Sequence, residues 1–142
     1  MSKNNMRKNV GFTLIELLVS LAIIGMISSI AVLSISNVKM KQRDAQRMSH
    51  MKEIAKALNL YQNQAGTYPS YEGLVTGSDD MSQALESQNT IAAVPTDPLY
   101  TSPTSAYAYK YESDGTDFLI TFCLETDSII GYNPGCENTI KP

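Results

Sequence analysis

The stretch VGFTLIELLVSLAIIGMISSIAVLSIS, residues Val10–Ser36, decides how this chain is organised. Between Leu17 and Ile35 its only polar side chains are serines, and as a helix this run would be about 28 Å long. That length is close to the ~30 Å hydrocarbon core of a bilayer, so we predict a membrane-spanning helix over residues 12–36. A cleaved secretory signal would instead have a shorter apolar region followed by a small-residue cleavage site.

An acidic residue, Glu16, lies near the start of this apolar run. A carboxylate in a lipid-embedded helix costs about 2.5–3.5 kcal/mol at the bilayer centre, so such a residue is usually paired and functional. The nearest base, Lys8, would be about 12 Å away along a helix. A partner from another chain, or a new amine made by proteolysis, therefore fits Glu16 better.

Charge is segregated along the 142 residues, which leave room for one small folded domain. A leader (residues 1–11) carries three basic residues, and a neck (37–65) carries six basic and two acidic residues. The head (66–142) carries eleven acidic and two basic residues, which argues against nucleic acid as its partner. Because both flanks of the apolar run are basic, charge alone does not decide its orientation in a membrane.

The neck has the apolar period of a helix that covers a core. The stripe consists of Met48, Met51, Ile54 or Ala55, Leu58 and Tyr61. Arg47 and the other charged residues fall mostly off this stripe. No proline interrupts residues 12–65, and Gly66 and Pro69 supply the stop. We therefore predict one continuous helix over residues 12–65, with the neck as its amphipathic continuation.

The head is predicted to begin as loop and to continue as sheet. Residues 70–105 are rich in Gly, Ser, Thr, Asp and Pro, with a short helix at Met81–Ser87 and a tight turn in VPTDPLY, residues 94–100. Alternating apolar residues then predict a hairpin that turns at Asp114-Gly115, and a third strand is predicted near Ser128–Tyr132. The alternating positions are Tyr107, Tyr109 and Tyr111 before the turn, and Phe118, Ile120, Phe122 and Leu124 after it. An antiparallel sheet that covers the neck stripe gives an α+β fold.

Two cysteines, Cys123 and Cys136, lie in the head. If the head is exported, they are expected to form a disulfide that stabilises it by about 3 kcal/mol in the chain-entropy model. If the head is cytosolic, they are two thiols. Two cysteines alone do not make a metal site.

The sequence resembles a known family at three places. GFTLIELLVSLAIIGMISSIAVLSI (residues 11–35) closely resembles the N-terminal signature of type IV pilins and of the pseudopilins of type II secretion. RDAQRMSHMKEIAKALNLYQNQAGTYPS (43–70) resembles the helix and Gly-x-Tyr-Pro end of the same families, and PTDPL (95–99) resembles their heads. This resemblance implies a pilin-like fold, in which a long N-terminal helix packs on a small antiparallel sheet. Many pilins have a proline midway along the apolar helix, where this chain has Leu33.

The resemblance also implies a function. A prepilin peptidase would cut after Gly11, and the new N-terminus, Phe12, would be methylated on its amine. The charged amine of Phe12 would pair with Glu16 of a neighbouring subunit in a helical filament. The leader would be cytoplasmic and the head would face outward, so the chain would be a single-pass inner-membrane precursor and then part of an extracellular filament. Its partners would be the peptidase, the assembly platform and its own copies. The charge pattern itself leaves two alternatives for the basic neck: it is solvated, or it pairs with acidic heads of adjacent subunits.

Alternatives to this assignment remain at the level of sequence. A pseudopilin of a secretion or competence system would share the same signature, and a monomeric membrane-anchored binding domain would keep its leader. We expect no enzyme activity and no cofactor: the single histidine, His50, has no evident nucleophile beside it. Calcium is an alternative, although the spacing of the acidic residues matches no calcium loop. The acids considered are Asp79, Asp80, Asp97, Asp114 and Asp117.

Overall fold

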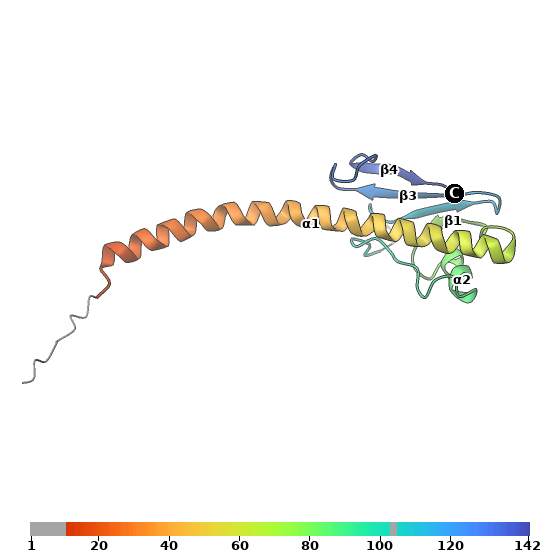
Figure 1. The fold of residues 1–142 in the computed structure, drawn as a ribbon, viewed down its shortest axis with the longest axis horizontal. Coiled ribbons are helices and arrows are strands. Elements are labelled where there is room, and N and C mark those ends of the chain that lie inside the picture. Colours follow the sequence, from red (N-terminus) through yellow and green to blue (C-terminus); the bar gives the residue numbers. More distant parts are fainter. Residues whose placement is uncertain (1–10, 103–104) are drawn as a thin grey trace, which may run out of the picture. The chain divides into compact units, whose positions relative to one another are not determined.

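The computed structural model describes residues 11–102 and 105–142, apart from the side chains of residues 30–34 (Figure 1). A long helix is followed by a short helix and a four-stranded antiparallel sheet, which is the predicted α+β, pilin-like arrangement. The elements are α1 (Leu14–Ala65), β1 (Tyr71–Leu74), α2 (Asp80–Ser87), β2 (Lys110–Ser113), β3 (Phe118–Leu124) and β4 (Gly135–Ile140). The chain divides into two compact units, residues 1–38 and 39–142, and α1 contributes to both.

Helix α1 begins two residues later than predicted and ends where predicted. It starts at Leu14, and Phe12 and Thr13 precede it as non-helical residues. It ends at Ala65, and Gly66 then adopts a φ of 83°, a left-handed conformation that glycine reaches without a Cβ penalty. The amide of Gly66 donates to the carbonyl of Gln62 at 2.8 Å, which closes the last turn.

The short helix α2 confirms the helix predicted at Met81–Ser87 and begins one residue earlier. Asp79 is its N-cap, and its Oδ1 accepts a hydrogen bond from the amide of Ser82 at 3.0 Å. An aspartate at this position satisfies a backbone N–H that the helix itself leaves unpaired. The turn predicted in VPTDPLY is also present, since the amide of Tyr100 donates to the carbonyl of Asp97 at 2.9 Å.

The sheet has the strand order β1-β2-β3-β4, so each strand lies beside its neighbour in sequence. The predicted hairpin is confirmed: Ser113 of β2 pairs with Phe118 of β3, and Asp114-Gly115 lies in the connecting turn. Gly115 has a φ of 100°, which explains why a glycine is needed in the turn.

Two strand predictions were wrong. No strand forms at Ser128–Tyr132, because the amide of Tyr132 donates to the carbonyl of Ile129 and closes a turn there. The strand after β3 is instead β4. Strand β1 lies in the segment predicted as loop, and its four residues, YEGL, are too few and contain a glycine, so they show little alternation.

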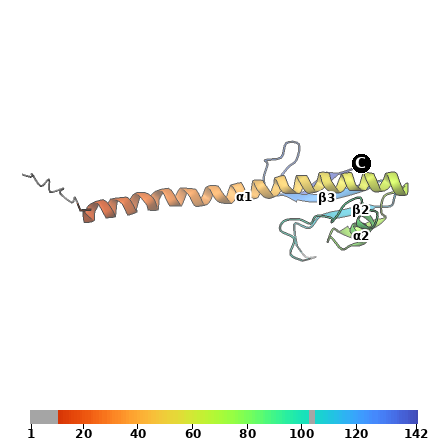
Figure 2. The same ribbon diagram turned by 60° about the horizontal axis from the view of Figure 1, so that its bottom comes forward.

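The core of residues 39–142 lies between the second half of α1 and one face of the sheet (Figure 2). Met51, Ile54 and Leu58 are fully buried, as the stripe predicted, and Met48, Ala55 and Tyr61 are partly buried against the same core. The sheet contributes the fully buried Tyr111 and Ile120. Tyr109 is also fully buried, but it precedes β2, and Tyr107 is only partly buried.

The prediction that Arg47 falls off the buried stripe was wrong, since its side chain is fully buried. A guanidinium is stable there only because carboxylates surround it. One carboxylate, Asp44, lies three positions before Arg47 on α1. The other two, Asp97 before β2 and Glu125 after β3, are distant in the sequence, so the local pattern does not show them.

Candidate functional site

The first turn of α1 is closed by Thr13 and Glu16. The Oγ1 of Thr13 accepts a hydrogen bond from the amide of Glu16 at 3.3 Å, and Oε2 of Glu16 accepts from the amide of Thr13 at 2.9 Å. The hydroxyl of Thr13 also donates to Oε2 at 2.7 Å. This reciprocal arrangement is a capping box, which satisfies two otherwise unpaired backbone donors. The sequence signal was present as Thr-x-x-Glu, but the prediction overlooked it.

The capping box leaves one oxygen of Glu16 unused. Among the described residues only Thr13 is hydrogen-bonded to this carboxylate, through Oε2. Oε1 is therefore available for a donor from outside the described part of the chain. In the described part of the chain, one oxygen of Glu16 therefore caps its own helix and the other accepts no hydrogen bond.

The predicted cleavage site lies immediately before this turn. Gly11, Phe12 and Thr13 are not helical, and the side chain of Phe12 is 77% exposed. A Cβ built on Gly11 meets no atom of residues 11–102 or 105–142 within 4 Å. The Gly11–Phe12 peptide bond therefore lies in an open, non-helical segment, which is the form of substrate that a protease cleft accepts.

The apolar side chains that follow are exposed along the whole described part of the run. The side chains of Leu14, Ile15 and Met26 are 76%, 69% and 72% exposed. Others with at least half of their surface exposed are Leu17, Leu18, Val19, Leu21, Ile23, Ile24, Ile27, Ile35 and Val38. A contiguous apolar surface of this kind marks a membrane or protein interaction site.

Three serines of this run hydrogen-bond within their own helix. The hydroxyl of Ser20 donates to the carbonyl of Glu16 at 2.6 Å, and that of Ser28 donates to Ile24 at 2.8 Å. Ser29 donates to the carbonyl of Met26 at 2.8 Å. Because their donors are satisfied internally, these hydroxyls add little cost when the helix surface is covered by apolar groups.

Within the described residues, no helical stretch is both long and apolar enough to cross a membrane. The span predicted over residues 12–36 includes residues 30–34, whose side chains lie outside the described part.

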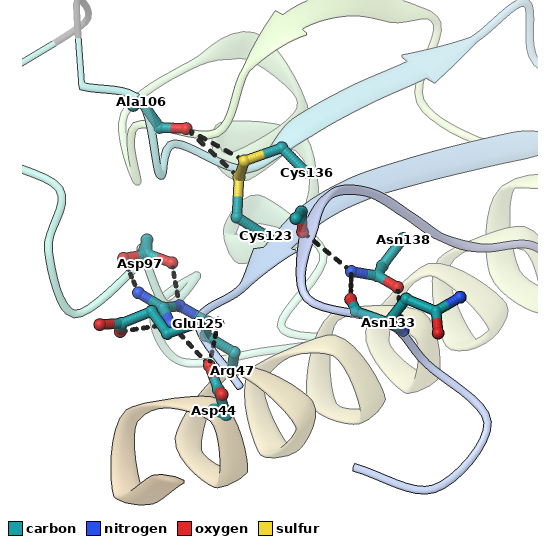
Figure 3. The surroundings of a disulfide bond; sticks show 10 residues. Asp44, Arg47, Asp97, Ala106, Cys123, Glu125, Asn133, Cys136 and Asn138 are labelled. Atoms are coloured by element: carbon teal, nitrogen blue, oxygen red, sulfur yellow. Dashed lines mark hydrogen bonds and ion pairs between the residues drawn. A yellow bond between two sulfur atoms is a disulfide. The ribbon is translucent and has the colours of Figure 1, made fainter. Parts of the chain in front are cut away.

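In the second unit, Arg47 joins three parts of the chain (Figure 3). Its Nε binds Oδ2 of Asp97 at 2.6 Å, and its Nη1 binds Asp44 at 2.8 Å and Glu125 at 2.7 Å. Arg43 also binds Glu125, and this hydrogen bond is the main reason that the pKa of Glu125 is lowered. We call these five residues the ion cluster.

Asp44 has a further role in the ion cluster. Its carboxylate accepts hydrogen bonds from the amides of Glu125 and Thr126, at 2.9 and 2.8 Å, and from the hydroxyl of Thr126 at 2.7 Å. The turn after β3 is therefore held on α1 by backbone donors as well as by ion pairs.

Cys123 and Cys136 form the predicted disulfide, which connects β3 to β4 (Figure 3). The bond lies where the register between the strands shifts, between Phe122 and Leu124. The side chain of Asn138 accepts from the amide of Asn133 and donates to its carbonyl, so it holds the loop that the disulfide closes.

The aspartates considered as calcium ligands have separate roles. Asp79 caps α2, Asp97 binds Arg47, and Asp114 accepts from the amide of Thr116 at 2.9 Å in the hairpin turn. Across residues 11–102 and 105–142, no three His, Cys, Asp or Glu side chains are grouped so that they could hold a metal ion.

His50 lies on α1, and its partly buried side chain contacts the core residue Tyr109. Its Nδ1 lies 3.1 Å from the hydroxyl of the buried Tyr109, and partial burial lowers the pKa of His50. This environment stabilises the neutral ring.

The comparisons with known proteins concern the N-terminal segment. A family model described as the prokaryotic N-terminal methylation motif matches residues 6–32. No curated protein and no solved structure matches the chain significantly. The matched segment contains the Gly11–Phe12 bond, the capping box and most of the exposed apolar surface described above. Residues 6–32 of this chain therefore match the prokaryotic N-terminal methylation motif, which is the class III prepilin signal of type IV pilins and pseudopilins.

Proposed function

We propose that this chain is a pilin, the structural subunit of a type IV pilus. It is made as an inner-membrane precursor with a cytoplasmic leader, cut by prepilin peptidase between Gly11 and Phe12, methylated on the amine of Phe12, and polymerised at the cell surface. The methylation motif at residues 6–32 is the single observation on which this proposal rests.

The first turn of α1 supports a pairing between subunits. After cleavage, Phe12 has a charged amine next to Thr13, and the capping box remains intact because it needs no atom of the leader. Oε1 of Glu16 then accepts the Phe12 amine of a neighbouring copy. In an apolar, water-excluded filament core such a pair is stabilised by low dielectric, and an unpaired Glu16 is penalised.

The exposed apolar surface supports polymerisation. Side chains such as Leu14, Ile24 and Met26 are not covered by the rest of the described chain. Lipid covers them in the precursor, and the same helices from other copies cover them in the filament. A structural subunit explains both this surface and the absence of an evident catalytic arrangement in the described residues.

The test of the pairing is Glu16→Ala in the natural host. We expect normal insertion and normal cleavage of the precursor, but a loss of at least about tenfold in filaments seen by electron microscopy, since a lost ion pair costs more than the 1.4 kcal/mol of a tenfold effect. The matched control is Glu53→Ala, which removes an exposed acid from the same helix within the second unit. Filaments of normal number from Glu16→Ala would refute the pairing.

Mass spectrometry of the exported protein separates this proposal from an anchored monomeric domain. A pilin gives a mature N-terminus at Phe12 that carries one methyl group, whereas an anchored domain keeps residues 1–11. The same motif occurs in pseudopilins, so a pseudopilin of a secretion or competence system is the second candidate. Long surface filaments at native expression levels indicate a pilus, and short periplasm-spanning assemblies indicate a pseudopilus.

A further inference from the structure

The outer face of the sheet, which points away from α1, is hollowed and acidic. A hollow of about 700 Å³ is lined by residues from β1, β2, the β2–β3 turn and the start of β3, and by Lys141 and Pro142. Its acidic side chains are Glu72, Glu112, Asp114 and Asp117, against Lys141. Lys110 is a second basic residue on this face and lines an adjoining hollow together with Glu72 and Glu112. We call this surface the acidic face.

The acidic face contains a like-charge pair that the folded chain does not neutralise. Glu72 of β1 lies directly opposite Glu112 of β2, and both side chains are exposed. Like charges opposite one another on neighbouring strands destabilise a sheet. Within the described residues neither glutamate forms an ion pair, so this arrangement favours a cationic partner from outside the chain.

The opposite side of the same unit presents lysines. Lys41, Lys52 and Lys56 are exposed and fall within about 60° of arc on α1, at 100° per residue. This arc lies away from the core side of the helix, where Met51 and Leu58 are buried. No described carboxylate forms an ion pair with these lysines. We call them the lysine stripe.

The two charged surfaces cannot meet within one copy. The helix covers the inner face of the sheet through a shared core, which includes Ile54 and Tyr111. The acidic face therefore lies on one side of the unit and the lysine stripe lies on the other. A contact between them is heterologous, joining different surfaces of two copies, and such contacts generate rings or open filaments.

We propose that the acidic face of one copy binds the lysine stripe of a second copy, so that heads are joined in a directional series. This proposal rests on the proposed polymerisation and names a surface that acts in addition to the N-terminal helices. Charge complementarity sets which sides of neighbouring heads meet, whereas the apolar helices supply most of the binding energy. The contact is partly exposed, so salt weakens it.

A charge-swap experiment on the full chain in the natural host tests this pairing. Glu72→Lys with Glu112→Lys is expected to lower the amount of sheared filament at least about tenfold, because like charges across an interface are strongly unfavourable. Lys52→Glu with Lys56→Glu is expected to have the same effect. The combination of all four substitutions restores opposite charges and should recover filaments to within about threefold of the unmodified chain.

Two single substitutions control for a general effect of charge. Asp127→Lys and Lys39→Glu change exposed residues outside both surfaces, and each is expected to leave the amount of filament unchanged. Folding is checked by the thermal midpoint of the purified chain in detergent. The variant with Glu72→Lys and Glu112→Lys replaces a pair of negative charges by a pair of positive charges. Its thermal midpoint should therefore equal that of the unmodified chain.

The outcomes separate this inference from the proposed function. If the unmodified chain forms filaments and both double variants do so equally well, the charge pairing is wrong and the pilin assignment stands. If the double variants fail and the fourfold variant fails equally, the pairing is also wrong. If the unmodified chain is neither cut at Phe12 nor assembled, the proposed function itself is wrong.

Discussion

Arg47 and Asp97, fifty positions apart in the sequence, form a fully buried ion pair with 2.6 Å between Nε and Oδ2. Asp97 also accepts a hydrogen bond from the amide of Leu99 at 2.7 Å, so the same carboxylate shapes the turn in PTDPL. The pair therefore ties the loop before β2 to α1. Because Arg47 also binds Asp44 and Glu125, one side chain organises three segments of the second unit.

Removal of Arg47 should strongly destabilise the second unit. Arg47→Ala leaves Asp44 and Asp97 buried without a cation, and breaking a buried pair in this way costs about 3–5 kcal/mol. The free energy of unfolding of the purified chain in detergent, from urea titration, measures the loss. Lys39→Ala, an exposed position at the start of the same unit, is the control and should change stability by less than about 0.5 kcal/mol. A loss of less than about 1 kcal/mol for Arg47→Ala would contradict this role.

The free energy of unfolding should decrease as the pH is lowered through the range in which Glu125 becomes protonated. Arg43 is the main cause of the lowered pKa of Glu125, whose ordinary value is 4.5. A depressed pKa in the folded state adds stability that is present above the ordinary pKa and is lost as the pH falls through the folded pKa. Unfolding measured from pH 7 to pH 3 should therefore show a decline that begins near pH 4.5.

Glu125→Gln isolates this contribution. The variant keeps the size of the side chain but does not titrate, so it should be less stable at pH 7 and should lose less stability on acidification. An acid decline as steep as that of the unmodified chain would assign the effect to other carboxylates.

The disulfide should stabilise the head measurably. Cys123 and Cys136 are thirteen positions apart, and a loop of this size corresponds to about 3 kcal/mol in the chain-entropy model. The double variant Cys123→Ala, Cys136→Ala should therefore unfold at lower denaturant concentration than the oxidised chain. Treating the unmodified chain with a reductant should reproduce most of this loss, whereas the double variant should not respond to the reductant. Equal stability of all three samples would show that the ion cluster and Asn138 hold the β3–β4 loop without the bond.

Substitutions at Gly11 should act on processing rather than on folding. Because a Cβ at Gly11 meets no atom of the described residues within 4 Å, we expect any defect to arise in recognition by the peptidase rather than in folding. Gly11→Ala should be cut in part, and Gly11→Leu should accumulate as precursor by at least about tenfold, since a 1.4 kcal/mol clash in the cleft suffices. Gel mobility and N-terminal mass report the uncut fraction. Ser36→Leu lies outside the matched motif and should be processed normally; rapid cutting of Gly11→Leu would count against cleavage at this bond.

Local features of the fold were predictable because they depend on neighbouring residues. The end of α1 at Gly66, the short α2 and the β2–β3 turn at Asp114-Gly115 each follow from capping or turn chemistry within a few positions. The buried stripe at Met51, Ile54 and Leu58 follows from the helical period. The failures at β1 and β4 have the opposite cause: four or six residues with little alternation become strands only because β2 and β3 offer them partners.

The candidate N-terminal site was almost wholly present in the sequence. Gly11, Phe12 and Glu16 occur within six residues, and the matched motif contains all three. Even the overlooked capping box was visible as Thr13-x-x-Glu16. The structure added the free oxygen of Glu16 and the open backbone at Gly11, both of which require coordinates.

By itself, the sequence determined the prepilin signal, the long helix with its two kinds of surface, the hairpin and the pair of cysteines. These features arise from residues that are close together in the chain or that repeat with a helical or strand period. Only the tertiary structure decided that Arg47 is buried among Asp44, Asp97 and Glu125, and that the lysine stripe and the acidic face lie on opposite sides of one unit. The physical reason is that burial of a charge, and the side on which a surface lies, depend on contacts between segments distant in sequence, which no local pattern records.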